Sequence, residues 1–175
     1  MAISRIRALQ EIEDLRAPSL SITRSIEATV HDTFTAWTKP EFTRLWWAPT
    51  GCTPFVVLQD AQVGGAWRIG LNRAHGAPEI WQAGKYLELS EPKRLVMTFA
   101  WEQLGSRSEE TLLTVNFARQ GDRTTIHLHQ GIFESTQSRD AHFLAWSEAL
   151  DQLQTCLRDR RLPVQSVSSA AHYVR

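Results

Sequence analysis

The sequence predicts an α+β protein in which a curved antiparallel sheet of about seven strands wraps round one long C-terminal helix, the helix-grip fold. Alternating apolar and polar residues recur between residues 20 and 131 and favour strands. A helix near the end carries a continuous apolar stripe, formed by Phe143, Trp146, Leu150, Leu153 and Leu157. An antiparallel sheet has to cover one face, and only this helix is long and apolar enough, so it is expected to lie in the hollow of the sheet.

A strand and a short helix are expected at the start of this domain. Leu20 and Ile22 alternate with polar residues, which indicates a strand. Thr29 is expected to cap a helix that runs through Trp37. Asp32 follows at the spacing of a weak capping box, which supports a helix start at this point.

A second short helix is expected over residues 41–46, because Pro40 breaks the first helix and suits the first turn of the next. Pro49 then forces the chain out of helix. Trp46 and Trp47 end this second helix, and adjacent helical side chains point about 100 degrees apart. One ring is therefore expected to plug the core, while the other lies at the edge of an opening.

Six more strands are expected, because alternating runs are separated by turn signals such as Gly64-Gly65. They cover Thr53–Leu58, Ala66–Asn72, Ile80–Leu89, Leu95–Trp101, Thr111–Ala118 and Thr124–Gly131. The polar segment Glu102–Glu110 is expected to be a loop. The final helix is expected over Arg139–Arg160, and Pro163 stops it.

The composition is that of an ordinary globular protein and narrows the choice of partners. Among 175 residues, 19 basic residues balance 19 acidic ones, so neither nucleic acid nor an anionic membrane is expected as a partner. The two cysteines lie far apart and form no metal-binding motif, so no metal or cofactor is expected. Free thiols fit a reducing cytoplasm, which is the expected location.

Three regions are expected along the chain: a helical extension over residues 1–18, the helix-grip domain over 19–161, and a loose tail over 162–175. The extension contains a short amphipathic helix, Ile3–Leu15. Two interpretations of this helix stay open. It is either a mobile terminus or a contact that joins two copies into a homodimer.

Strand parity predicts which side chains face the long helix. In the strand over residues 80–89 both faces carry apolar residues, so parity does not decide between Trp81 and Tyr86. The interior is either a filled core or a cavity of ligand size. The expected lining of a cavity is Trp46, Trp67, Ile69, Tyr86, Met97, Phe99, Trp101, Val115, Phe143, Trp146 and Leu150.

No group of polar residues marks a catalytic centre. His127 and His129 share a strand face, and a pair with this spacing can bind zinc. However, parity gives the inner face to Ile126 and Leu128, so the histidines are expected to point to solvent. His142 is also expected at the surface. No converging acid–base pair is visible, so no catalytic residue is assigned and an enzyme is less favoured than a binding protein.

Six motifs occur in an order and spacing that resemble one superfamily. They are Ala36-Trp37-Thr38-Lys39-Pro40-Glu41, Trp46-Trp47-Ala48-Pro49, Val63-Gly64-Gly65-Ala66-Trp67-Arg68, Gly84-Lys85-Tyr86-Leu87-Glu88, the run from Pro92 to Phe99, and the run from Ala145 to Leu150. From residue 20 to residue 157 the chain resembles the START-like, Bet v 1-like (SRPBCC) proteins. Within them it looks like the branch of heat-shock protein 90 ATPase activator homologues. Ala145 stands where the family often has Gly.

Three functions follow as hypotheses from the fold and the resemblance. The leading one is binding of a hydrophobic or aromatic small molecule between sheet and helix, driven by burial of apolar surface. The second is an enzyme of cyclase or hydrolase type that acts on a hydrophobic substrate. The third is a chaperone- or protein-binding module with a role in stress, which the resemblance implies by analogy alone.

Overall fold

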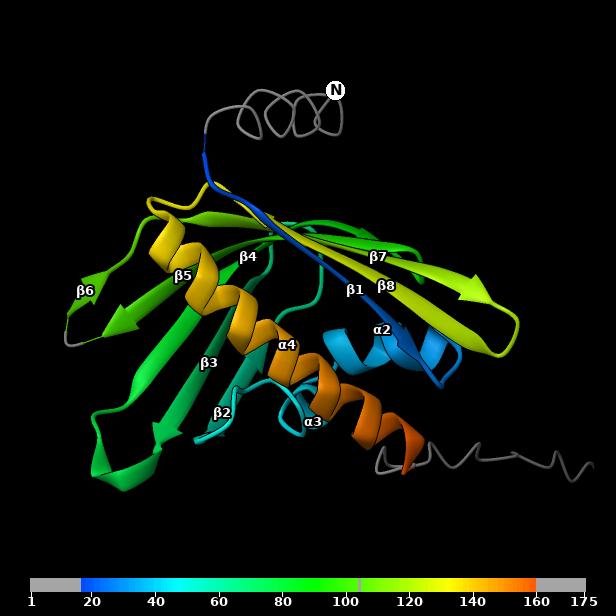
Figure 1. The fold of residues 1–175 in the computed structure, drawn as a ribbon, viewed down its shortest axis with the longest axis horizontal. Coiled ribbons are helices and arrows are strands. Elements are labelled where there is room, and N and C mark those ends of the chain that lie inside the picture. The colour runs from blue at the N-terminus through cyan, green and yellow to red at the C-terminus, as the bar shows by residue number, and fades with distance from the viewer. Residues whose placement is uncertain (1–16, 104, 160–175) are drawn as a thin grey trace, which may run out of the picture.

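The computed structural model describes residues 17–103 and 105–159, and the expected N-terminal helix and C-terminal tail lie outside them. An antiparallel sheet curls round the long helix α4 in the order β1-β8-β7-β5-β4-β3-β2, and the short strand β6 pairs with β5 (Figure 1). The strands are β1 (Leu20–Ile26), β2 (Cys52–Gln59), β3 (Ala66–Arg73), β4 (Ile80–Ser90), β5 (Arg94–Gln103), β6 (Ser106–Arg107), β7 (Thr111–Gln120) and β8 (Arg123–Gly131). The helices are α2 (Val30–Thr38), α3 (Pro40–Thr43), the 3-10 turn η1 (Ala74–Gly76) and α4 (Thr136–Arg158). The predicted α+β helix-grip fold is confirmed.

The two short helices lie beside the C-terminal half of α4 (Figure 1). The cap of α2 is the predicted one, because the Asp32 backbone nitrogen donates to Thr29 Oγ1 at 3.1 Å and the Thr29 hydroxyl donates to the Asp32 carboxylate at 2.8 Å. Pro40 occupies the first turn of α3, as expected. That helix ends at Thr43, earlier than the predicted residue 46, and the chain continues through turns that accept Trp46 and Trp47 into the core.

Strand parity is confirmed for the inner face of the sheet. Cross-strand neighbours share that face, as in the pair Met97 and Leu113 and the pair Val115 and Leu128. All four are at most 1% exposed. In β4 the undecided choice falls to Tyr86, which is fully buried, whereas Trp81 lies half-buried on the outer face beneath the Arg68 guanidinium.

The segment Glu102–Glu110 is more ordered than the predicted loop. β5 extends to Gln103, the chain turns at Gly105, and β6 pairs back so that Arg107 lies opposite Glu102. Arg107 also forms ion pairs with Glu102 and Glu110. Both faces of this protruding hairpin are polar, so its sequence lacks the apolar alternation by which a strand is recognised.

The apolar stripe predicted for α4 requires one correction at its first turns. Phe143 is 43% exposed and faces away from the sheet, while His142, expected at the surface, is only 6% exposed. The next buried residues of α4 are Trp146, Ala149 and Leu150. The reason is chemical: strands β5 and β8 place hydrogen-bonding groups under this turn, and they suit an imidazole rather than a phenyl ring. In the described part of the chain, no helix is long and apolar enough to cross a membrane.

Because Gly84 in β4 has no side chain, the Trp67 indole of β3 can lie over β4 and reach Thr98 in β5. A Cβ atom at this position would lie 1.9 Å from the Thr98 carbonyl oxygen and 2.7 Å from Trp67 Nε1. The Trp67 indole donates to that same oxygen at 3.2 Å, so both neighbours are fixed.

Gly84→Ala is therefore expected to lower the free energy of unfolding by at least about 2 kcal/mol, measured by urea denaturation. Gly70→Ala in the adjacent strand is the control. Its added methyl would meet only side-chain atoms, the far end of the Phe55 ring at 2.6 Å and a methyl of Val56 at 2.9 Å. Phe55 is 41% exposed and can move, so the loss should be smaller. Equal losses in the two variants would contradict this account.

Candidate ligand-binding site

Tryptophan rings from four parts of the chain meet between the sheet and α4. Trp37 lies 4.7 Å from Trp46 and 5.8 Å from Trp146, measured between ring centroids. Trp47 lies 5.0 Å from Trp146 and 5.6 Å from Trp67. These separations fall in the favourable range for aromatic pairs, and the pairs include stacked, tilted and edge-on arrangements. The cluster fixes the end of α3 against α4 and builds one wall of the site.

Trp46 and Trp47 take different roles in this wall. The Trp46 indole is 1% exposed and donates to the Ala36 carbonyl at 2.9 Å, so it seals the core. The Trp47 indole donates to the Gln82 side-chain oxygen at 2.6 Å, and its ring borders a pocket. The two adjacent rings thus take the two predicted roles, although they lie in turns beyond the end of α3, and Trp47 rather than Trp46 borders the pocket.

A pocket, here called the inner pocket, lies between the first half of α4 and strands β4 and β5. Its lining is Trp47, Ala48, Pro49, Gln82, Phe99, Trp101, His142, Ala145, Trp146 and Ala149. The cavity between these side chains measures about 20 Å³. Because such a volume holds about one water molecule, a larger ligand requires a side chain to move.

One polar network crosses the inner end of this pocket and is centred on Gln130 of β8. The Gln130 side-chain oxygen accepts from the Trp146 indole at 2.7 Å and contacts His142 Nδ1 at 3.2 Å. The Gln130 amide donates to Thr111 Oγ1 at 2.7 Å, and that hydroxyl donates to the Phe99 carbonyl at 3.1 Å. Every member of the chain is thereby partnered, as buried polar groups require.

The network determines the tautomer of His142. The Trp101 indole can only donate, and it lies 2.8 Å from His142 Nε2, so that nitrogen carries a lone pair. The proton is then on Nδ1, where it is donated to Gln130. Burial lowers the pKa of His142 from 6.5 to about 4, because the charged imidazolium would lose its hydration. A neutral imidazole is therefore the form that the site holds near neutral pH.

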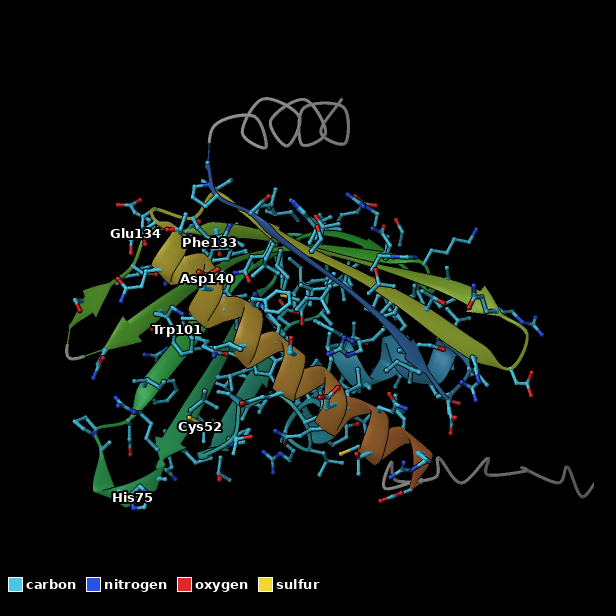
Figure 2. The ribbon with its side chains drawn as sticks, in the orientation of Figure 1. Cys52, His75, Trp101, Phe133, Glu134 and Asp140 are labelled. Carbon is cyan, nitrogen blue, oxygen red and sulfur yellow. The ribbon has the colours of Figure 1, made fainter. Side chains whose placement is uncertain are left out.

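A second pocket, here called the outer pocket, lies on the other side of Trp101. Its lining is Phe99, Trp101, Ser108, Glu109, Thr111, Ile132, Glu134, Ser138 and His142. Phe99, Trp101 and His142 line both pockets and so form the partition between them. In Figure 2, Trp101 lies beside the first turns of α4, and Glu134 lies near the start of that helix. Trp101 is half-buried, so its ring can rotate toward solvent and out of the partition.

The structure places the predicted cavity residues in three groups. Phe99, Trp101 and Trp146 line the inner pocket. Phe143 lies on the exposed side of α4 and lines neither pocket. The remaining predicted residues are packed into the core at no more than 2% exposure: Trp46, Trp67, Ile69, Tyr86, Met97, Val115 and Leu150. Most of the interior is thus filled, and the space lies at one end of it.

Sequence reasoning did not identify Gln82, Gln130 or His142 as site residues, although a signal for two of them exists. Gln130 continues the inner-face parity of Ile126 and Leu128, and Gln82 shares the face of Tyr86. A polar amide at an inward strand position indicates a buried hydrogen-bond network. His142 lacks such a signal, because Phe143 beside it fits the apolar stripe better by residue type.

Tyr86, expected as a ligand-orienting hydroxyl, lies apart from both pockets. Its oxygen accepts from the Gln59 amide at 2.9 Å, and the same amide donates to the Trp37 carbonyl. Burial raises the pKa of Tyr86 to about 12, so the phenol stays protonated. Its contacts stabilise the junction of α2 and β2.

The metal-binding arrangement considered for the HxH pair does not form. His127 is exposed on β8 and lies opposite Thr23, with 3.2 Å between His127 Nδ1 and the Thr23 hydroxyl. Within residues 17–103 and 105–159, no three His, Cys, Asp or Glu side chains converge as metal ligands would.

A curled sheet around one long helix, with a pocket between them, defines the START-like, Bet v 1-like class of proteins. Within that class, the family described as activator of Hsp90 ATPase homolog 1-like protein matches residues 27–158, and the chain belongs to this family. No curated protein matches the chain.

Solved structures of bacterial proteins share the fold. A protein from Chromobacterium violaceum is 23% identical over 79% of this chain and 96% of its own, with a TM-score of 0.72. The AHSA1 protein from Silicibacter pomeroyi is 16% identical over 82% of this chain and 99% of its own, with a TM-score of 0.74. A protein from Arthrobacter aurescens is 20% identical over 89% of this chain and 93% of its own, with a TM-score of 0.70.

Proposed function

We propose that this protein binds a hydrophobic, aromatic small molecule in the inner pocket. The observation that carries the proposal is an apolar wall of three aromatic rings, Trp47, Phe99 and Trp146, beside the half-buried ring of Trp101. Ligand sites are mainly apolar and aromatic with a few polar groups that fix orientation, and the Gln82 amide supplies one here. Membership of a family with a ligand-binding type of fold adds support.

Entry of such a ligand requires the partition to open. The Trp101 indole is held by a hydrogen bond to His142 and by edge contacts with the rings of Phe99 and His142, whose centroids lie 5.6 and 5.8 Å from its own. Rotation of the indole out of this position would join the inner and outer pockets. The lost hydrogen bond is worth about 1 kcal/mol net, which burial of apolar ligand surface readily offsets.

The proposal is tested by titrating a panel of aromatic compounds into the protein and measuring binding by calorimetry. Ala145→Phe fills the inner pocket from α4 and is expected to weaken binding by at least roughly tenfold, since the ligand would lose its cavity. Ala141→Phe, at an exposed position of the same helix, is the matched control and should bind as the wild type does.

Two outcomes would contradict the proposal. Unchanged affinity in Ala145→Phe would place the ligand elsewhere. A complete absence of binding to the wild-type protein would leave the outer surface as the site of function. Stimulation of heat-shock protein 90 ATPase activity by the same protein would then favour the chaperone-binding alternative, and turnover of a panel compound would favour the enzyme.

A further inference from the structure

We propose that the ligand carries a positively charged amine next to its aromatic body, and that this amine lies between Glu109 and Glu134 in the outer pocket. The inference rests on the proposed binding function and adds the charge of the ligand and its orientation. The aromatic body occupies the inner pocket, and the amine extends past the partition formed by Trp101 and His142.

The charges that line the two pockets are all of one sign. Glu109 and Glu134 line the outer pocket, and neither pocket is lined by any Lys or Arg among the described residues. His142 is neutral, because its Nε2 accepts the Trp101 hydrogen bond. A carboxylate ligand would therefore meet repulsion and find no cation, whereas an ammonium group would find two carboxylates.

The two glutamates are also unpaired, unlike the acids around them. Arg107 forms ion pairs with Glu102 and Glu110, on either side of Glu109 in sequence. Arg139 pairs with Asp140 near Glu134. Within the described parts of the chain, no ion pair or side-chain hydrogen bond is formed by the carboxylate of Glu109 or Glu134. Both carboxylates are thus available to a ligand.

A second, independent feature points to a ligand at the opposite end of the site. Gln82 lines the inner pocket and is only 5% exposed. Its side-chain oxygen accepts from Trp47, but its amide nitrogen donates to no residue in the described chain. This nitrogen is not one of the fully buried polar atoms that lack a partner among the described residues, so it keeps access to the pocket that Gln82 lines. It can therefore donate to an oxygen acceptor on the ligand. From its inner to its outer end, the site therefore has the Gln82 amide donor, then the aromatic lining of the inner pocket, then the two carboxylates of the outer pocket.

Between these ends, the aromatic rings suit a cationic ligand. Trp101 and Phe99 line both pockets, so an amine that passes the partition moves along ring faces. A cation within about 6 Å of an indole face is attracted by the ring quadrupole. The displaced Trp101 ring can thus contact the ligand amine after it leaves His142.

Three naphthalene compounds of matched shape test the inference by calorimetry at low ionic strength: 2-naphthylmethylamine, 2-naphthylmethanol and 2-naphthoate. The amine is expected to bind most tightly and the carboxylate most weakly. Glu109→Gln and Glu134→Gln should each weaken the amine by roughly two- to fivefold, as exposed ion pairs do, and leave the alcohol unchanged. Glu79→Gln, an exposed acid that lines neither pocket, is the control.

The outcomes separate this inference from the function on which it rests. The inference that the ligand is positively charged would be overturned if the alcohol bound as tightly as the amine, or if neither glutamine variant changed the affinity for the amine. Either result would leave the proposed function intact. Failure of all three compounds to bind would overturn both. A loss of amine affinity with added salt, absent for the alcohol, would support the inference.

Discussion

Trp146→Ala is expected to lower the free energy of unfolding by about 3–5 kcal/mol, the largest single effect among the substitutions considered. The Trp146 ring stacks on Trp37, meets Trp47 edge-on and approaches Phe99, so its removal opens a cavity at the centre of the aromatic cluster. Its indole is also one of the two donors to Gln130. Urea denaturation followed by far-ultraviolet circular dichroism measures the loss.

Phe143→Ala is the matched control for this prediction. Phe143 has a similar aromatic ring on the same helix but is 43% exposed, so the expected loss is at most about 1 kcal/mol. A loss at Phe143 equal to that at Trp146 would mean that α4 presents a different face to the sheet. The stripe predicted from sequence alone would then have been right about Phe143.

Acidification from pH 7 toward pH 4 is expected to destabilise the fold through His142. The pKa of His142 falls from 6.5 to about 4 in the folded chain, so the unfolded chain binds more protons within this window. The contribution of the neutral imidazole to the free energy of unfolding is therefore fully present above pH 6.5, and it is lost as the pH falls to about 4. The size of the loss is on the order of 3 kcal/mol.

His142→Gln isolates this effect, because a glutamine side chain does not titrate. The difference in unfolding free energy between wild type and variant is expected to shrink as the pH falls through the window, and paired urea titrations at several pH values measure it. Protonation would place an N–H on Nε2 facing the Trp101 indole N–H, which breaks that hydrogen bond. A constant difference across the window would show that His142 is not the titrating group.

Much of the fold could be predicted from the sequence because its signals are local. Alternation fixed the inward faces of β3, β5, β7 and β8, and the cap at Thr29 and the break at Pro40 placed the short helices. Parity could not decide β4, where both faces are apolar. The deciding contact is long-range: Gly84 lies beneath Trp67, which fixes the face that Tyr86 shares.

The candidate site was harder to predict, since its residues depend on pairing between distant elements. His142 is buried because Trp101 of β5 and Gln130 of β8 bond to its two ring nitrogens, and neither partner is near it in sequence. Residue type alone favoured Phe143 for that position. The same limit applied to Trp46 and Trp47, whose division of roles was predictable although the assignment of each ring was not.

The packing of the tryptophan rings has a spectroscopic consequence. Rings that lie 4.7 to 5.8 Å apart and are held at fixed tilts exchange excitation energy, so their ultraviolet transitions belong to the group rather than to one chromophore. Such an ordered array gives a near-ultraviolet circular dichroism signal that disappears when side chains lose fixed packing, even where the backbone stays folded. The near-ultraviolet signal of the tryptophan cluster therefore reports how tightly the sheet packs against α4.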